Sequence, residues 1–214
     1  GVRSLRTALH FSSLDRQNNC TVLTGPSPSI GKTFLSVNLA ALLATNGQRV
    51  LVIDADMRRG HMHDYFDGQR EGGLSEVIAD NLPWQQQVRS TAVPGLDFMS
   101  TGVLPPNPSE LLLHKRFSLL LQEVSAAYDH VLIDTPPVIA VTDAVIVGRQ
   151  CGVTLLVARY GTSLLADPAS WADLPASADA LIVSNTTVAP LYAERLALQL
   201  RQRHRRVLQL ALPD

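Results

Sequence analysis

Three short segments bring together residue types that bind phosphate and divalent cations. A glycine, a lysine and a threonine end the stretch Thr24–Thr33, and acidic residues directly follow the apolar runs Val50–Ile53 and Val131–Ile133. Lysine and backbone N–H groups neutralise phosphate oxygens, whereas hydroxyl and carboxylate oxygens are the ligands that Mg²⁺ prefers. Occurring in this order, the three segments predict a nucleotide site with a bound magnesium ion.

The stretch Thr24–Thr33 resembles a P-loop, because it lies between an expected strand and an expected helix. Gly31 lets the backbone approach phosphate oxygens, Lys32 would reach the β- and γ-phosphates, and the Thr33 hydroxyl would hold Mg²⁺. The strict pattern is missed by one position, since five residues separate Gly25 from Gly31. Alone, the stretch could equally be an ordinary Gly/Pro turn. The residues expected to bind the nucleotide are Gly25, Ser29, Ile30, Gly31, Lys32, Thr33 and Phe34.

The acidic residues end two expected strands. Asp54 and Asp56 follow the first strand one residue apart, so alternation places them on one side, where they could hold a metal or accept a proton. Asp134 ends the second strand, as a Walker B acid does, and could coordinate Mg²⁺ directly or through water. The alternative for each is a surface acid at a solvated strand end.

The elements that must position these residues alternate along the chain, which predicts an α/β fold with a doubly wound, mostly parallel sheet. Ligands of such sheets lie at the carboxyl ends of the strands. The expected strands are Thr21–Thr24, Val50–Ile53, Leu96–Met99, Val131–Ile133, Val153–Ala158 and Leu181–Val183. The expected helices are Thr33–Thr45, Gly73–Ala79, Ser109–Ala127 with Ser109 as N-cap, and Thr142–Arg149.

Composition excludes several functional classes. The 214 residues carry 18 Lys and Arg against 19 Asp and Glu, for a formal net charge of −1, which is against a general nucleic-acid binder. Cys20 and Cys151 have no metal-ligand spacing, so we expect a reducing compartment. Apolar runs fall short of the roughly 18 residues that a spanning helix needs. The net charge, the cysteine content and the short apolar runs together favour a soluble, cytoplasmic protein.

The motifs resemble those of the bacterial tyrosine kinases, the cytoplasmic domains of polysaccharide co-polymerases that control capsule and exopolysaccharide export. The resemblance spans about residues 1–160 and includes two segments more specific than a P-loop, Gly102–Leu112 and Ile133–Ala144. Arg3–Thr7 resembles the end of the family's Glu/Arg/Arg helix, which contacts the neighbouring subunit in a ring. The family's Glu would precede Gly1, so we expect the chain to be a fragment of something longer.

The resemblance implies a P-loop NTPase fold with deviant Walker motifs and transfer of the γ-phosphate of ATP to protein tyrosines. It implies that Lys32 stabilises the phosphates, that Thr33, Asp54 and Asp134 hold Mg²⁺, and that Asp56 is the base for the tyrosine hydroxyl. Arg58 and Arg59 would steady developing charge or bind an acidic partner surface, the alternative being a solvated basic turn. The resemblance also implies that the full-length protein lies at the inner face of the bacterial inner membrane, joined to a co-polymerase part and assembled as a homo-oligomeric ring.

The sequence departs from the family pattern in the placement of its tyrosines. The family has a tyrosine-rich tail, whereas Tyr65, Tyr128, Tyr160 and Tyr192 are scattered, so we expect the substrate tyrosine in trans. A partitioning or cell-division ATPase switch is the alternative function. Such ATPases usually carry a second Lys near the start of the loop, where this chain has Gly25 and Pro26.

Residues 162–214 form an atypical segment after the expected kinase domain at 1–161. Gly161–Pro168 and Ala180–Tyr192 resemble the start of 3-dehydroquinate synthase, which predicts a strand, a helix and a strand. The resemblance suggests a gene fusion, a frame or assembly accident, or a tail recruited by truncation. The activity of that enzyme is not expected, because its metal-binding domain is missing. The alternative is that the segment simply completes the sheet; a fusion product without function is a third reading.

Overall fold

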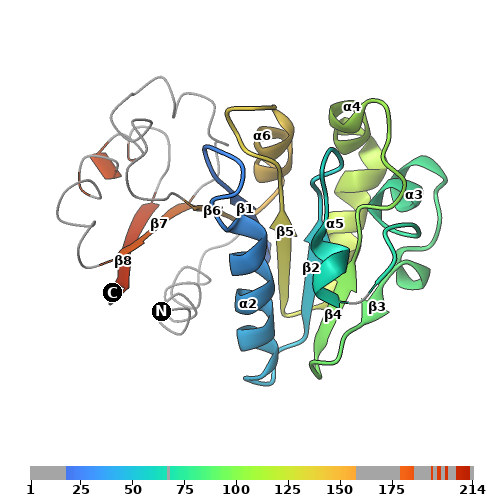
Figure 1. The fold of residues 1–214 in the computed structure, drawn as a ribbon, viewed down its shortest axis with the longest axis horizontal. Helices are drawn as coiled ribbons and strands as arrows, with labels where there is room; N and C mark the ends of the chain where they lie inside the picture. The colour runs from blue at the N-terminus through green and yellow to red at the C-terminus, as the bar shows by residue number, and fades with distance from the viewer. Residues whose placement is uncertain are drawn as a thin grey trace.

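The computed structural model describes residues 18–66, 68–157 and 179–185, together with 194, 197–198, 201 and 206–212. These residues form a sheet covered by helices (Figure 1). Its eight strands lie in the order β3-β4-β2-β5-β1-β6-β7-β8. They are β1 (Cys20–Thr24), β2 (Val50–Asp54), β3 (Arg89–Ser90), β4 (Leu96–Met99), β5 (His130–Asp134), β6 (Val153–Leu156), β7 (Asp179–Asn185) and β8 (Arg206–Leu212).

The strand order places a topological switch point beside β1. All neighbouring strands in the described part are parallel except β3 and β4, and β1 lies between β5 and β6. The connection from β1 to β2 therefore runs to one side of β1, and the connection from β5 to β6 runs to the other. Loops beyond the carboxyl ends of strands at such a point form ligand sites. The expected doubly wound, mostly parallel sheet is confirmed.

Helices cover both faces of the sheet, which explains why its central strands are apolar throughout. Val52 packs on the face covered by α2, whereas Leu51 and Ile53 pack on the opposite face with Phe117 and Val124 of α5. In Figure 1, α2 crosses the front of the sheet and α5 lies behind it. The helices are α2 (Lys32–Ala44), α3 (Leu74–Ala79), α4 (Pro108–Leu113), α5 (Lys115–Ala127) and α6 (Asp143–Gly148), with 3₁₀ turns η2 (Met62–Phe66) and η3 (Trp84–Gln86).

The single helix expected over Ser109–Ala127 is wrong. The chain breaks at His114, whose backbone is extended (φ −65°, ψ 140°) and whose Nδ1 accepts the N–H of Arg116 at 3.2 Å, so that His114 caps α5. Ser109 is not an N-cap either: Asn107 occupies that position and Pro108 starts α4. Proline suits the first helical position, because its missing N–H has no helical partner there.

Two strands from the C-terminal quarter extend the sheet. β7 pairs in parallel with β6, and β8 pairs in parallel with β7. The expected strand Leu181–Val183 falls within β7. Tyr160, Tyr192 and the segments Arg3–Thr7 and Gly161–Pro168 lie outside the described residues. None of the helices that the structure describes combines the length and hydropathy needed to cross a membrane.

Candidate active site

The loop between β1 and α2 has the backbone of an anion-binding turn. Ser29 (φ 57°) and Gly31 (φ 94°) both adopt left-handed conformations directly before α2 begins at Lys32. Such a backbone turns successive N–H groups inward, and the first N–H groups of the helix add to them. At Gly25 a side chain would collide with the carbonyl oxygen of Val157, so only glycine fits there. The loop can therefore wrap a phosphate group.

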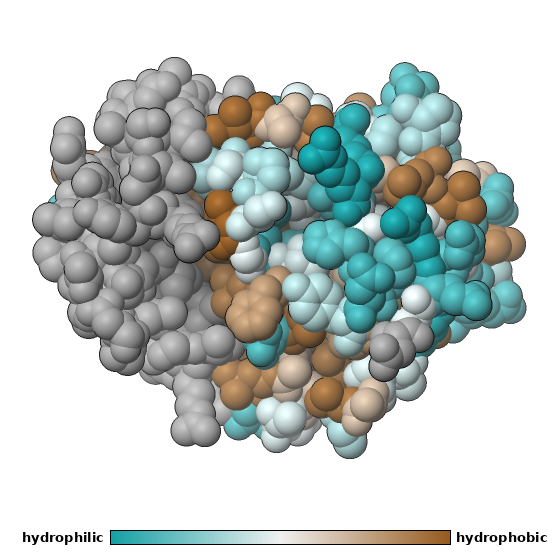
Figure 2. Space-filling model, in the orientation of Figure 1, coloured by the Kyte–Doolittle hydropathy of each residue, from teal (hydrophilic) through white to brown (hydrophobic). Residues whose placement is uncertain are grey.

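A cavity of about 830 Å³ opens beside this loop. Lys32, Thr33 and Phe34 from the start of α2 line this cavity, and so do Asp56 and Arg58 from the turn after β2. The remaining lining residues are Pro28, Ser29, Gly31, Arg59, His61, Tyr65, Pro136, Pro137, Ala140 and Val141. Figure 2 shows strongly hydrophilic residues over the loop that follows β2, beside hydrophobic residues near the start of α6.

Most of the sequence-predicted site residues meet at this cavity, but some do not line it. Gly25 and Ile30 do not line the cavity. They lie against each other, so closely that a Cβ atom at position 25 would overlap the Ile30 side chain. Asp54 and Asp134 do not line it either; they are almost completely buried beside it, 1% and 2% exposed. The predicted loop thus forms one part of the cavity wall, and the two buried acids lie outside that wall.

Asp134 is tied to the start of α2. Its carboxylate accepts the hydroxyl of Thr33 at 2.6 Å and the hydroxyl of Ser36 at 3.2 Å. Burial raises the pKa of Asp134 to about 6, although the Thr33 hydrogen bond, the charge of Lys32 and the Ser36 hydrogen bond oppose this. Ser36 was not among the predicted site residues; its spacing, one helical turn after Lys32, is the only signal in the sequence.

Asp54 stands opposite Asp134 on the neighbouring strand. Burial, followed by the charge of Asp134, raises the pKa of Asp54 to about 8, and the N–H groups of Met62 and Asp56 only partly offset this. Two buried carboxylates on adjacent strands repel one another, and a cation between them would remove that repulsion.

These oxygens fit Mg²⁺. The atoms that could bind the metal are all hard oxygen donors, namely the carboxylates of Asp54 and Asp134 and the hydroxyl of Thr33. Among the described residues no three His, Cys, Asp or Glu side chains cluster as a metal site by themselves. The hydroxyl, phosphate oxygens and water would therefore have to complete the coordination, as is usual for Mg²⁺ at nucleotide sites.

Asp56 lies in a tight turn on the wall of the cavity. Its Oδ1 accepts the backbone N–H groups of Arg58 (3.2 Å) and Arg59 (3.0 Å), and its carbonyl accepts the N–H of Gly60 at 2.6 Å. The other carboxylate oxygen has no hydrogen-bond partner in the described part of the chain and is available to a ligand. The turn therefore aims an oriented carboxylate into the same cavity as Lys32.

Arg58 and Arg59 are both exposed in this turn, but the Arg58 guanidinium is bound by partners within the protein. Its Nε and Nη2 donate to both carboxylate oxygens of Asp143, at 2.9 and 3.2 Å, and Nη2 also donates to the Ser109 hydroxyl at 3.0 Å. Ser109 in turn donates to Asp143 at 2.6 Å. Asp143 is completely buried. Sequence reasoning missed this Arg58–Asp143–Ser109 cluster, because no pattern joins residues that lie 85 positions apart.

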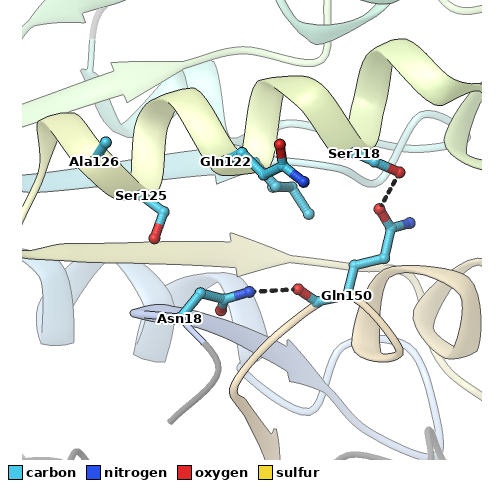
Figure 3. Close-up of a pocket in the computed structure, with 7 residues that line it drawn as sticks. Asn18, Ser118, Gln122, Ser125, Ala126 and Gln150 are labelled. Atoms are coloured by element: carbon cyan, nitrogen blue, oxygen red, sulfur yellow. Dashed lines mark hydrogen bonds between the residues drawn. The ribbon is translucent and has the colours of Figure 1, made fainter.

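A second pocket, of about 530 Å³, lies at the opposite end of the sheet, between α5 and the segments that precede β1 and β6. Figure 3 shows two hydrogen bonds to Gln150 in this pocket: Asn18 donates to its backbone carbonyl at 2.8 Å, and Ser118 donates to its side chain at 2.7 Å. It contains no charged side chain. The phosphate-binding features therefore belong to the first cavity alone within the described residues.

Comparison with known proteins agrees with this geometry. A family model described as an AAA domain matches residues 28–156. The tyrosine-protein kinase Wzc of Salmonella typhimurium is 50% identical over 164 residues, covering 77% of this chain and 23% of the relative. The kinase domain of Escherichia coli tyrosine kinase ETK superposes with a TM-score of 0.74 at 36% identity, over 100% of this chain and 75% of that chain.

A cell division ATPase, MinD of Pyrococcus furiosus, also superposes, with a TM-score of 0.65 over 84% of this chain and 79% of that chain. Its identity is only 18%, so this likeness shows the P-loop fold alone. The identity to the kinases is much higher, and the chain spans 23% of the length of the curated relative named above. The chain therefore belongs to the family of bacterial tyrosine-protein kinases, within the AAA-domain proteins.

Proposed function

We propose that this chain is the catalytic domain of an ATP-dependent protein-tyrosine kinase of the bacterial type. The observation that carries the proposal is the meeting of Lys32, Thr33 and Asp56 in one cavity, since phosphoryl transfer needs a phosphate clamp, a metal-holding oxygen and a proton acceptor together. Membership of the tyrosine-kinase family supports the same activity.

Each residue has a role in this proposal. The Lys32 ammonium and the N–H groups of the loop would hold the β- and γ-phosphates of ATP. Thr33, Asp54 and Asp134 would hold Mg²⁺, which when bound neutralises the charge on the phosphates. Asp56 would accept the proton of the tyrosine hydroxyl while that oxygen bonds to the γ-phosphorus and the bond to the ADP oxygen breaks.

The wider setting is also a proposal. We infer a substrate tyrosine supplied in trans, a membrane co-polymerase part and a homo-oligomeric ring, at the inner face of the inner membrane in capsule or exopolysaccharide export; the family resemblance supports this. The kinase domain would comprise residues 1–161. Residues 162–214 would be an appended segment derived from 3-dehydroquinate synthase, and the resemblance at Ala180–Tyr192 supports that origin.

Peptide phosphorylation tests the proposal against the ATPase-switch alternative. Purified chain is incubated with Mg-ATP and a tyrosine-rich peptide beside the Lys32→Ala variant, and phosphotyrosine and ADP are both measured. Phosphotyrosine that is lost in the variant supports the kinase. ADP release without phosphotyrosine would favour the ATPase switch. Neither product, from a chain that melts cooperatively and is stabilised by Mg-ADP, would refute both activities.

A further inference from the structure

Two adjacent arginines on the cavity wall have different surroundings. The Arg58 guanidinium is bound by Asp143 and Ser109, whereas the Arg59 guanidinium makes no hydrogen bond or ion pair with the described residues. Both contribute backbone N–H groups to the carboxylate of Asp56. The side chain of Arg58 therefore connects the turn that orients Asp56 to a buried part of the protein.

The connection spans three elements. Arg58 lies in the turn after β2, Ser109 lies in α4, and Asp143 is the first residue of α6. α4 and α6 pack against one another. The Asp143 carboxylate is completely buried, and Arg58 is the cation that the structure places against it. A buried carboxylate with a two-pronged partner has one favoured position for that partner, so the turn is held at a fixed place.

We infer that Arg58, anchored by Asp143 and Ser109, is a positioning residue that holds the carboxylate of Asp56 in place for phosphoryl transfer. The inference rests on the proposed kinase function. Arg58 acts through the backbone of its turn: its N–H and that of Arg59 fix the Oδ1 of Asp56, a residue that lines the cavity. A misplacement of a reacting group by about 1 Å can lower a rate about 100-fold.

Lysine does not replace arginine in this arrangement. An ammonium keeps the charge, but its three N–H groups diverge from one nitrogen and lack the planar fork that places two parallel N–H groups against the two oxygens of Asp143. We therefore expect Arg58→Lys to fold, to keep its KM for ATP within about twofold, and to lose about 10- to 100-fold in kcat. The matched control is Arg49→Lys, since Arg49 forms an exposed pair with Asp129 at 3.1 Å at the other end of β2.

The decisive measurement is a kinetic cycle with Asp56→Asn. If Arg58 acts through Asp56, the double variant Arg58→Lys/Asp56→Asn has the same kcat as Asp56→Asn alone. Additive losses, or a rise in the KM for ATP that matches the fall in kcat, would overturn the inference and leave Arg58 a merely structural residue. An unchanged kcat in Arg58→Lys would also overturn it.

Failure of the proposed kinase function and failure of the inference about Arg58 give different results. If wild-type protein forms no phosphotyrosine, the proposed function fails and this inference fails with it; if wild type is active and Arg58→Lys matches it, only this inference fails. If Arg58→Lys does not fold, Ser109→Ala takes its place, because it removes one contact to Arg58 and one to Asp143. It should lower kcat by a smaller factor, also without effect in the Asp56→Asn background, and an additive loss there refutes the inference.

Discussion

Replacing Arg58 with methionine should cost far more stability than a surface arginine normally does. The change leaves the Asp143 carboxylate fully buried, with the Ser109 hydroxyl as its only side-chain donor among the described residues. Removing one partner of a buried ion pair costs about 3–5 kcal/mol. Because 38% of the Arg58 side chain is exposed, solvent screens part of this interaction, and we expect about 2–3 kcal/mol.

Urea denaturation at pH 7, followed by circular dichroism, measures this loss. Arg49→Met is the control, since that arginine also pairs with an aspartate but 64% of its side chain is exposed. Its midpoint should stay close to that of wild type. The double variant Arg58→Met/Asp143→Asn should be more stable than Arg58→Met alone, because it removes the uncompensated buried charge.

Equal midpoints for Arg58→Met and Arg49→Met would refute the reasoning. So would a double variant that is less stable than Arg58→Met, since this would mean that Asp143 contributes through contacts other than its pair with Arg58. Either result would also remove the physical basis for treating the cluster as an anchor.

Three further perturbations test other parts of the structure. Burial acts to raise the pKa of Glu76, but hydrogen bonds from Gly72, Ser75 and Gly73 outweigh it and hold that pKa below its usual value. Glu76→Gln should therefore lose about 1–2 kcal/mol at pH 7, and this difference from wild type should shrink in melts at acidic pH, as the pH falls through the lowered pKa and the wild-type carboxylate protonates. Gly73→Ala should lower the free energy of unfolding by about 1–3 kcal/mol, because the new methyl group would overlap backbone atoms of the Ser100–Gly102 segment; an unchanged urea midpoint would mean that this segment yields freely. Thr33→Val should raise the Mg²⁺ concentration needed for half-maximal activity about 10- to 100-fold, and an unchanged Mg²⁺ titration would exclude Thr33 as a ligand.

The sequence predicted the site where chemistry and strand order coincide. Each group of site residues follows an apolar strand: the loop at Gly31-Lys32-Thr33, the acids Asp54 and Asp56, and Asp134. Because parallel strands end at the same edge of the sheet, these groups lie close together. Their burial could not be predicted: Asp56 lines the cavity, whereas Asp54 is 1% exposed and carries a raised pKa. That difference depends on which strands are neighbours.

Other features have no local signal. The break at His114 interrupts an apolar pattern that reads as one helix, because it depends on a side chain capping the helix that follows. The two-residue strand β3 has no apolar pattern and exists only through its pairing with β4. The pairing of Arg58 with Asp143 depends on the positions of α4 and α6 against the sheet. Each arises from tertiary packing and not from periodicity.

The ratio of phosphotyrosine to ADP, measured in one reaction of the chain with Mg-ATP and a tyrosine-rich peptide, tests the central claim most directly. A kinase predicts ADP formation that depends on the peptide, with about one phosphotyrosine for each ADP, and loss of both in Lys32→Ala and of phosphotyrosine in Asp56→Asn. ADP released at the same rate without peptide, and with no phosphotyrosine, would contradict the account and assign the cavity to ATP hydrolysis.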